Sequence, residues 1–498
     1  MMIALITIGG VGLASPSAYA FESGVFTKAP AFSKTLVQCT DHDGDDEYTK
    51  GNVRADIPSD AGYTTYWDEC ISLDEVKEWV CEDGRAVGLS IGCDFGCDDG
   101  ACALPPWVEE QKLGGSSRWW DGEFAHSVAL SGDTALIGAS KHEQLGDEAG
   151  AAYVFTSNSG EWTEEQVFLA SDGAAYDYFG TSVSLSGDVA VIGAPSHDSG
   201  TGPTGAVYVF RKGANEWVFE QKLVASDGEA QDNFGVSVAV WGDVIVVGAH
   251  LNDEPGQDNS GAAYVYRYNG ATWVEEQKLV APDAESSDKF GLAVSVYGDT
   301  AVIGTPFDDD SGNNAGSAYI FSYDGYEWVF EQKLLASDGD EYDYFGGSVS
   351  VSGSVVVIGA YSDDDSGTYA GSAFVYRFDG QTWNEEAKLL GSDVASGDHF
   401  GSAVSIYEDT VVVGAHWHDG GEYEENSGAA YVYRFVDEAW LEEAKMVASD
   451  AYYQNKFGNA VAVHDDVILV GSLFGDGPGT DVGTAYIFRS TGDKIRNI

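Results

Sequence analysis

Basic residues are scarce in this chain of 498 residues. It has 24 Lys and Arg against 82 Asp and Glu, which gives a formal charge of −58. A chain with so little positive charge has no basic surface to replace the counterions of a phosphate backbone, so we expect no nucleic-acid partner. The same charge repels anionic lipid headgroups. No apolar run beyond the N-terminal segment approaches the ~20 residues of a membrane span, so we expect no transmembrane anchor.

Cysteine is absent after residue 102, and an even number clustered in a short segment is typical of a disulfide framework. We therefore predict a small disulfide-rich domain over residues 21–104. Its six cysteines are Cys39, Cys70, Cys81, Cys93, Cys97 and Cys102. The sequence does not choose among the fifteen possible pairings. A thiolate metal site at Cys93, Cys97 and Cys102 is the alternative, although these spacings are not C-x-x-C and an oxidising compartment disfavours free thiolates.

The N-terminal segment indicates export. An apolar run over residues 3–13 is followed by Ala18 and Ala20 in an A-x-A cleavage pattern, so residues 1–20 are predicted to be a signal peptide. No Lys or Arg precedes the apolar run, and a buried apolar strand is the alternative interpretation. We expect the mature protein to be secreted or exposed at the cell surface.

One unit of about 55 residues occurs seven times after residue 105. An aromatic residue followed by a small one opens each copy: Phe124-Ala125, Phe179-Gly180, Phe234-Gly235, Phe290-Gly291, Phe345-Gly346, Phe400-Gly401 and Phe457-Gly458. Each unit contains four short runs of strand character, most of them separated by turns that contain glycine. This pattern predicts an all-β, seven-bladed β-propeller of four-stranded blades over residues 105–490, with a C-terminal tail at 491–498.

The ends of the repeat array favour a closed ring over an open solenoid. The fourth strand of a unit begins with Trp, but the last unit has no fourth strand, and an extra copy, WVEEQKL, starts at Trp107 before the first unit. We therefore predict that residues 107–113 form the outer strand of the last blade and close the ring. A solenoid would carry polar capping units at both ends.

The units resemble FG-GAP repeats, which build the propeller of integrin α chains and occur in many secreted microbial proteins. The resemblance rests on Phe-Gly at each start and on Gly-Ala-Pro or a variant after the second strand, as in Gly193-Ala194-Pro195 and Gly304-Thr305-Pro306. It implies a propeller fold and says less about function, because propellers have many activities. Integrin-type calcium blades carry a D-x-D-x-D-G-x-x-D loop between the first two strands. Here that connection is a tight turn such as Ser186-Gly187-Asp188, so the family's calcium sites are not expected.

Acidic residues concentrate on one face of the predicted propeller. In an up-and-down blade, the loops between strands 2 and 3 lie on the same face as the loops that lead to the next blade. These two sets of loops hold 36 of the 82 acidic residues, opposed by only Arg118, Lys141, Lys289 and Lys456. We therefore expect a strongly negative potential on this face.

Three interpretations of this acidic face remain open. Charge alone favours solubility. The Asp172 and Asp177 pair recurs in most units and indicates carboxylates that cap their own turns. Carboxylate oxygens also suit a divalent cation, calcium above all. The candidate calcium ligands are Asp308, Asp309, Asp310, Asp363, Asp364 and Asp365, together with Asp41, Asp43 and Asp45 in the cysteine-rich domain.

The Asp41-to-Asp45 segment has the 1-3-5 spacing of a calcium loop. It departs from that motif at position 6, which is Asp46 instead of Gly, and at position 12, which is Asn52 instead of Glu.

Residues that break the repeat pattern are the candidate ligand-binding residues. They lie in three loops near the point where the ring closes, and aromatic rings there could stack on sugars or anchor a protein partner. Docking of the cysteine-rich domain is the alternative role. These residues are Arg118, Trp119, Trp120, His416, Trp417, His418, Tyr452 and Tyr453.

Catalytic motifs are sparse. Gly88-Leu89-Ser90-Ile91-Gly92 matches a nucleophile-elbow string, but it lies in the disulfide-rich domain without the strand-turn-helix context, so we interpret it as chance. The sequence favours a secreted, non-enzymatic binding or adhesion protein whose acidic face contacts an extracellular protein or glycan. An extracellular enzyme acting on glycans is the alternative. The oligomeric state is left open.

Overall fold

The computed structural model describes the backbone of eight short strands between residues 39 and 102, and residues 106–116, 122–200, 202–420, 425–475 and 482–491 in full. The chain divides into two compact units, Met1–Pro105 and Pro106–Ile498. Several predictions lie outside the described residues. These are the signal peptide, the cysteine side chains, the side chain of Asp41, and the whole of Asp43, Asp45, Arg118, Trp119 and Trp120.

The first unit contains three small antiparallel sheets, with strand orders β1-β2-β3, β4-β5-β6 and β7-β8. Its strands are β1 (Cys39–Asp41), β2 (Asn52–Asp56), β3 (Tyr63–Trp67), β4 (Glu69–Ser72), β5 (Glu75–Glu82), β6 (Arg85–Gly92), β7 (Cys97–Asp98) and β8 (Ala101–Cys102).

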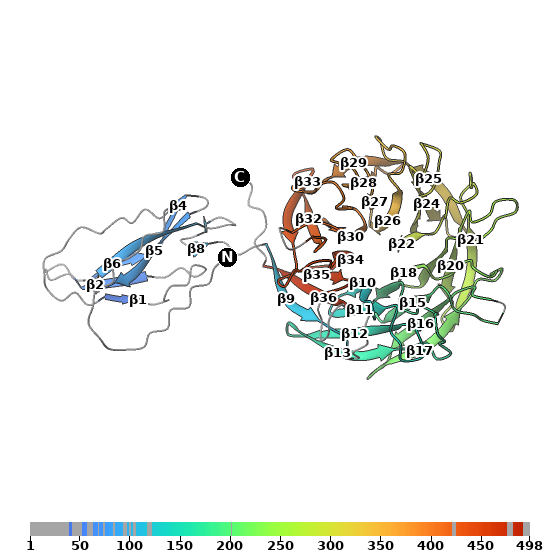
Figure 1. Ribbon diagram of the computed structural model, residues 1–498, viewed down its shortest axis with the longest axis horizontal. Coiled ribbons are helices and arrows are strands. Elements are labelled where there is room, and N and C mark those ends of the chain that lie inside the picture. Colours follow the sequence, from blue (N-terminus) through green and yellow to red (C-terminus); the bar gives the residue numbers. More distant parts are fainter. Residues whose placement is uncertain are drawn as a thin grey trace. The chain divides into compact units, whose positions relative to one another are not determined.

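The second unit is a ring of seven antiparallel sheets, each of four strands (Figure 1). The first strand of each blade lies nearest the ring axis. These strands are β10 (Phe124–Ser131), β14 (Val183–Ser186), β18 (Ser237–Trp241), β22 (Ala293–Tyr297), β26 (Phe345–Ser352), β30 (Ala403–Tyr407) and β34 (Phe457–His464). The second strands are β11 (Thr134–Ala139), β15 (Val189–Ala194), β19 (Val244–Ala249), β23 (Thr300–Thr305), β27 (Val355–Ala360), β31 (Thr410–Ala415) and β35 (Val467–Ser472).

The third and fourth strands form the outer part of each blade (Figure 1). The third strands are β12 (Ala151–Asn158), β16 (Ala206–Lys212), β20 (Ala262–Tyr268), β24 (Ser317–Tyr323), β28 (Ser372–Phe378), β32 (Ala429–Val436) and β36 (Thr484–Ser490). The fourth strands are β13 (Glu161–Phe168), β17 (Trp217–Leu223), β21 (Trp273–Leu279), β25 (Trp328–Leu334), β29 (Trp383–Leu389), β33 (Ala439–Met446) and β9 (Trp107–Leu113). The predicted all-β propeller of seven four-stranded blades is confirmed.

The outer strand of the seventh blade comes from the start of the ring. Strand β9 pairs antiparallel with β36, from Leu113 opposite Ala485 to Trp107 opposite Ser490. Trp107 belongs to the apolar cluster between the sixth and seventh blades, and Leu113 to the cluster between the seventh and first. Strand β9 therefore contributes to the packing on both sides of its blade.

The hydrophobic core lies between neighbouring blades. Nearly every residue of the second strands is buried, because each of these strands has another blade on either side. One cluster joins Leu136 and Val154 of the first blade to Ile192 and Tyr208 of the second. Apolar residues on both faces of these strands follow from this stacking, since an alternating pattern would bury polar side chains.

The Phe-Gly pair does not always open the first strand. Strands β10, β26 and β34 begin at the Phe, but β14 begins at Val183, four residues after Phe179. Phe179 N–H instead donates to Ala149 O in the 2–3 loop of the preceding blade, at 3.0 Å. The same bond to the preceding blade is made by Phe345 and Phe457, where β26 and β34 do begin at the Phe, so it anchors the blades to one another without deciding where the strand begins.

Glutamines on the fourth strands link neighbouring blades through two hydrogen bonds each. Gln166 Nε2 donates to Trp217 O and Gln166 Oε1 accepts from Trp217 N–H, both at 3.0 Å. The same two hydrogen bonds join Gln111 to Trp162, Gln221 to Trp273, Gln277 to Trp328 and Gln332 to Trp383. The equivalent residues of the fifth and sixth blades are Ala387 and Ala444, which cannot form it.

Replacing Ala387 with Gln is expected to stabilise the propeller by about 1–2 kcal/mol, because it adds two hydrogen bonds to the backbone of Trp440. Urea unfolding monitored by circular dichroism measures the gain. Gln332→Ala is the matched control and should lose a similar amount. A neutral or destabilising Ala387→Gln variant would show that this interface does not accept the link.

Candidate ligand-binding face

Two sets of loops are hydrogen-bonded together on one side of the ring. Tyr176 N–H, in the loop that leads to the second blade, donates to Asp147 O in the 2–3 loop of the first blade at 2.7 Å. Equivalent bonds join Tyr342 to Asn313 at 2.8 Å and Gln454 to Glu425 at 2.9 Å. The 2–3 loops and the blade-to-blade loops therefore share a face, as predicted, and we call this surface the loop face.

The second aspartate of each repeated pair caps its own turn. Asp177 Oδ2 accepts from Ala174 N–H at 2.8 Å. The same three-residue turn is capped by Asp232, Asp288, Asp343 and Asp398. The predicted structural role of these residues is confirmed, and they are buried.

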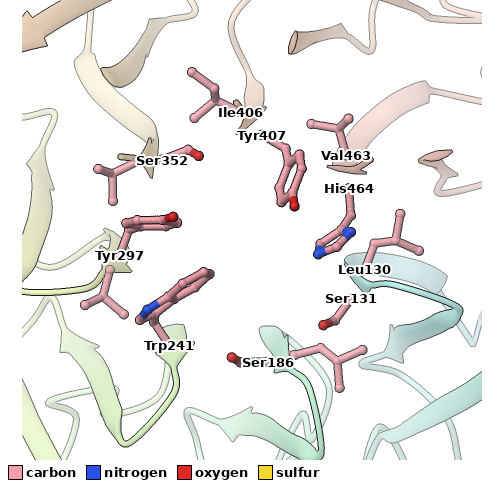
Figure 2. Close-up of a pocket in the computed structure, with 13 residues that line it drawn as sticks. Leu130, Ser131, Ser186, Trp241, Tyr297, Ser352, Ile406, Tyr407, Val463 and His464 are labelled. Carbon is pink, nitrogen blue, oxygen red and sulfur yellow. The ribbon is translucent and has the colours of Figure 1, made fainter. Parts of the chain in front are cut away.

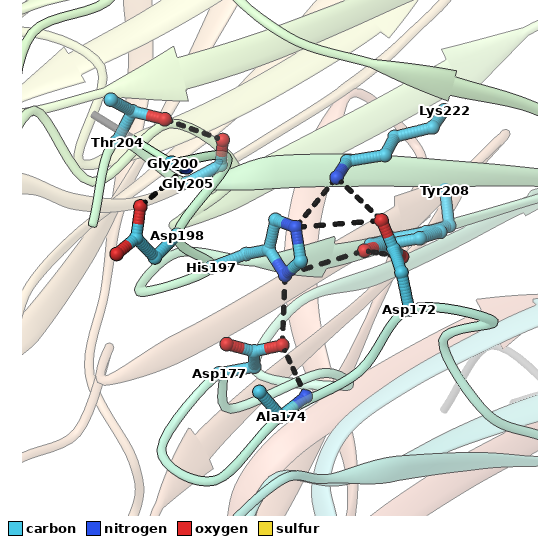
Figure 3. A network of polar contacts seen from close by, with 10 residues as sticks. All are labelled: Asp172, Ala174, Asp177, His197, Asp198, Gly200, Thr204, Gly205, Tyr208 and Lys222. Atoms are coloured by element: carbon cyan, nitrogen blue, oxygen red, sulfur yellow. Dashed lines mark hydrogen bonds and ion pairs between the residues drawn. The ribbon is translucent and has the colours of Figure 1, made fainter. Parts of the chain in front are cut away.

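The first aspartate of each pair has a different role. Tyr208 Oη donates to one oxygen of Asp172 at 2.7 Å, and Lys222 Nζ donates to the other at 2.9 Å (Figure 3). Burial raises the pKa of Asp172, but these hydrogen bonds outweigh it and lower the pKa below its usual value. Six blades have a lysine at the position of Lys222 on the fourth strand, and each lysine pairs with such an aspartate. The pairs are Lys112–Asp450, Lys222–Asp172, Lys278–Asp227, Lys333–Asp283, Lys388–Asp338 and Lys445–Asp393.

These lysines correct the expected electrostatics of the loop face. The sequence-based count placed only four basic residues against 36 acidic ones, because it left out the fourth strands. Six ammonium groups reach the loop face from those strands and neutralise part of its charge. The face is therefore a set of ion pairs with excess negative charge, and not a uniform acidic surface.

Histidines extend this network in the second and sixth blades. Lys222 Nζ contacts His197 Nε2 at 2.5 Å, and His197 Nδ1 lies 2.8 Å from Asp177 Oδ2 (Figure 3). Because an ammonium can only donate, Nε2 accepts and the ring proton sits on Nδ1. His418 forms the same chain with Lys445 and Asp398, both at 2.7 Å.

The two histidines singled out in the sequence do not converge. His418 is buried in the Lys445–Asp398 chain, whereas His416 Nδ1 lies 2.8 Å from Ser402 Oγ. Burial lowers the pKa of His416 to about 3, so its ring is neutral. His418 is thus a structural residue, and His416 supports the loop that carries Trp417.

The Asp308–Asp310 and Asp363–Asp365 triplets surround lysine side chains. Lys333 Nζ lies 2.7 Å from Asp308 and 2.6 Å from Asp310, while Asp309 Oδ1 accepts from Asn314 N–H at 2.6 Å. In the fifth blade Lys388 Nζ contacts Asp363 at 2.8 Å and Asp365 at 2.6 Å. The backbone carbonyl of Asp364 accepts from Gly367 N–H. The outer two carboxylates of a triplet therefore face one cation, and the middle one does not.

Among the residues that the structure describes, one group of three acidic side chains could hold a metal ion: Asp338, Asp363 and Asp365. Lys388 Nζ lies within 2.9 Å of an oxygen of each. A calcium shell needs six to eight oxygens, and here a lysine ammonium occupies its centre. The first two strands of the second blade are joined by the two-residue turn Gly187-Asp188, so the integrin-type loop has no counterpart there. With the lysine in place, these residues do not fit a calcium ion.

Buried carboxyl pairs distinguish the fourth and fifth blades. Asp308 takes the place of His197, so Asp288 faces a second acid instead of a histidine. Burial and the charge of Asp308 raise the pKa of Asp288 to about 7. Burial and Asp363 raise the pKa of Asp343 to about 6. Asp288 and Asp343 are therefore expected to keep their protons to a higher pH than an ordinary aspartate does.

Asp288→Asn is expected to stabilise the protein by about 2 kcal/mol at pH 8 and by little at pH 5. The folded protein holds the Asp288 proton more tightly than the unfolded chain does. The stability that the folded protein gains from this proton is therefore present below pH 4 and is lost as the pH rises from about 4 through 7. Urea unfolding across this range measures the effect.

Asp232→Asn is the matched control, because the partner of Asp232 is the neutral Asn252, at 2.9 Å. This variant should show no gain that grows with pH. An equal gain in both variants would trace the effect to the overall charge of the chain and not to the paired carboxyls.

The residue before each Phe has a left-handed backbone in every blade. Its φ angle lies between 49° and 59° at Glu123, Tyr178, Asn233, Lys289, Tyr344, His399 and Lys456. Non-glycine residues in this region cost about 1–3 kcal/mol each and tend to cluster at functional sites. The backbone conformation at this position is the same in all seven blades, but the residue type changes. The position therefore changes the chemistry of the loop face from blade to blade without changing its backbone.

In the fourth to sixth blades this variation produces a chain of aromatic contacts, which we call the aromatic arc. It consists of Phe307, Tyr344, Tyr361, His399 and Trp417. Successive ring centroids lie 5.3, 5.3, 5.9 and 5.1 Å apart. Lysines flank both ends, with Lys289 3.9 Å from the Phe307 ring and Lys456 5.4 Å from the Trp417 ring.

The aromatic arc contains only one of the predicted ligand-binding residues. Trp417 is 41% exposed, and Tyr452 and Tyr453 are exposed on the blade-to-blade loop that also carries Lys456. The other four members were missed because each is a single residue that breaks no motif by itself. Comparing the residue before each Phe across the seven units would have identified Tyr344 and His399.

These features define a propeller built from one repeat, with a variable aromatic and charged surface on its loop face. The FG-GAP repeat model matches residues 107–155, 162–210, 217–266, 273–321, 328–376, 383–433 and 440–488. The chain therefore belongs to the FG-GAP repeat family.

Integrin alpha-7 of Rattus norvegicus is similar to this chain, with 29% identity over 189 residues. The match covers 35% of this chain and 16% of that protein, so the chain spans a small part of the relative's length. No helix of the described residues is long and apolar enough to cross a membrane.

Proposed function

We propose that this chain is an exported, non-enzymatic binding or adhesion protein whose aromatic arc and adjoining loops contact an extracellular protein or glycan. The main supporting observation is that five aromatic side chains contact one another in sequence on hydrogen-bonded loops, two of them, Tyr344 and His399, on a left-handed backbone. Partly exposed aromatic residues on a rigid frame are typical anchors of binding sites. Membership of the FG-GAP family and the similarity to an integrin alpha chain support a role at the cell surface.

In this proposal the remaining parts of the chain serve export and stability. Residues 1–20 direct secretion, and the six cysteines form disulfides in the N-terminal domain. Strand β9 closes the ring and keeps the loop face in one piece. We do not propose hydrolysis of glycans, because Asp288, whose pKa is raised to about 7 as a general acid requires, is buried.

Calcium enters the proposal only at Asp338, Asp363 and Asp365, where an ion must displace Lys388. We expect calcium to bind weakly there, with a dissociation constant of about 1 mM. Lys388→Met should lower stability by about 2–3 kcal/mol, because it leaves three carboxylates unpaired, and about 5 mM calcium should restore part of the loss. Thermal melting measures both effects.

Lys222→Met is the matched control for the calcium experiment, because Lys222 contacts one carboxylate and a histidine. This variant should be destabilised without recovery in calcium. If calcium leaves Lys388→Met unchanged as well, calcium has no place in the function.

The function is tested by a glycan array and by pull-down of extracellular proteins with the full chain. Trp417→Ala and Tyr344→Ala should each weaken binding to any hit at least about tenfold, since a buried aromatic anchor contributes about 2 kcal/mol or more. Tyr326→Ala is the control, because Tyr326 is 90% exposed in a turn between β24 and β25, on the opposite face. Unchanged binding in both arc variants would contradict the proposal.

A further inference from the structure

A pocket lies on the ring axis, on the face opposite the loop face (Figure 2). The turns between strands 1 and 2 and those between strands 3 and 4 share this side, as when Tyr323 N–H donates to Asp299 O at 2.9 Å. We call this side the turn face. The first strands of all seven blades end around the pocket, whose volume is about 130 Å³. We call it the axial pocket.

Aliphatic residues lie behind the rim of the axial pocket. They are Leu130, Leu185, Val296, Val351, Ile406 and Val463, the next-to-last residues of six first strands. All six are buried in the apolar clusters between blades, so they fix the strand ends that carry the rim residues.

The rim consists of three serines and four aromatic residues, one from each blade. Ser131, Ser186 and Ser352 each accept a bond from a backbone N–H in the turn of the next blade. Their hydroxyl oxygens are therefore used in joining blades.

The aromatic rim residues form two close pairs, each with its rings tilted by 33°, that face each other across the opening (Figure 2). The Trp241 and Tyr297 centroids are 4.0 Å apart, and those of Tyr407 and His464 are 4.3 Å apart. Trp241 is 39% exposed. Contact with Tyr297 therefore leaves part of the Trp241 ring uncovered, and a ligand between the two pairs could contact it.

Negative charge surrounds the rim. Asp465 lies 3.3 Å from His464, and Glu408 directly follows Tyr407. Burial and the charges of Asp465 and Glu408 raise the pKa of Tyr407, which is a sign of negative potential at the opening. The residues that line the pocket include no Lys or Arg. Asp133 and Asp299 lie in the turns of the first and fourth blades, whereas Asp188 and Asp243, in the turns between them, pair with Arg211 and Arg267 at 3.5 and 3.7 Å.

We propose that the axial pocket binds a small organic cation of the quaternary ammonium class, held between the Trp241–Tyr297 and Tyr407–His464 pairs. Aromatic faces attract such cations through the ring quadrupole, and the methyl groups of the ligand suit the apolar ring surfaces. The carboxylates beside the rim, Asp465 and Glu408, add attraction that a neutral molecule such as a sugar would not feel. This site is separate from the loop face and does not depend on the function proposed there.

Isothermal titration of the full chain with choline at low salt tests the site. The comparison ligand is 3,3-dimethylbutan-1-ol, which has the shape of choline without its charge. Choline should bind, and the neutral alcohol should bind at least about tenfold more weakly. Equal binding of the two compounds, tighter binding of glucose, or no heat with choline up to about 20 mM would overturn the proposal.

Substitutions locate the binding to the axial pocket. Trp241→Leu and Tyr407→Leu should each weaken choline binding at least about tenfold, and Asp465→Asn about threefold. Tyr326→Leu and Trp417→Leu should leave it unchanged, so a failure of the loop-face proposal is distinguishable. Trp241→Phe keeps an aromatic face and should retain most of the affinity, which separates lost recognition from misfolding. Choline affinity that is the same in wild type and Trp241→Leu would contradict the site.

A vesicle experiment distinguishes free choline from the choline headgroup of a lipid. Flotation of the chain with phosphatidylcholine vesicles should fail if the pocket accepts only free cations, and choline should then bind alone. Vesicle binding that choline competes away would assign the site to a lipid headgroup. Vesicle binding that Trp241→Leu leaves intact would contradict the role of the pocket.

Discussion

Replacing Gly248 with alanine is expected to destabilise the propeller by about 3 kcal/mol or more. A Cβ atom at Gly248 would lie 1.9 Å from Gly291 O and 2.3 Å from Ser237 Oγ. The first of these atoms is backbone of the next blade and cannot rotate away. The two blades would have to separate, which opens the buried cluster between them.

The same contact recurs around the ring. A Cβ would lie 1.9–2.0 Å from the carbonyl oxygen of the Phe-Gly glycine of the next blade at Gly138, Gly193, Gly248, Gly304, Gly359 and Gly414. Gly248 does not have a positive φ, so its need for glycine is purely steric. The glycine at the next-to-last position of these six second strands therefore sets how closely neighbouring blades approach.

Gly242→Ala separates this steric effect from backbone strain. Gly242 has a φ of 58° in a turn, and a Cβ there would meet nothing within 4 Å. Alanine should cost about 1 kcal/mol at Gly242, because of the left-handed backbone alone. Urea unfolding of the two variants measures the difference. Equal losses would mean that the blades have room to separate without disturbing the core.

The repeat made the fold predictable. The Phe-Gly pairs, the β-branched second strands and the two-residue turns each follow from local sequence, and seven copies make the pattern unambiguous. The bond from Phe179 to a loop of the preceding blade, however, is not visible in the repeat pattern. A pattern within one unit cannot reveal a bond made to the next.

The loop face was less predictable for the same reason. Lys333 reads as part of an amphipathic strand, and only the pairing of β25 with β24 brings it to Asp308 and Asp310, more than twenty residues away in sequence. The aromatic arc depends on a left-handed backbone at Tyr344 and His399 that directs their rings along the face. Neither feature follows from composition or spacing.

Trp107→Ala is expected to cost about 3–5 kcal/mol, as much as Trp328→Ala in the middle of the ring. The two residues occupy the same position in their blades. Trp107 is 5% exposed and donates from Nε1 to Glu443 at 2.9 Å, and Trp328 is 2% exposed and donates to Glu276 at 3.1 Å. If β9 closes the ring, removing either indole leaves the same kind of cavity between two blades.

The comparison of these two tryptophans therefore measures closure itself. A β9 segment that stayed detached in solution would leave Trp107 in water, and its replacement would then cost less than about 0.5 kcal/mol while Trp328→Ala kept its full effect. Hydrogen exchange of β36 gives a second readout, because an unpaired outer edge loses amide protection. Pairing with β9 covers the edge of β36 and gives the seventh blade the same kind of outer strand as the other six. Equal losses in the two variants, with β36 protected as strongly as β24, are the results that closure by β9 requires.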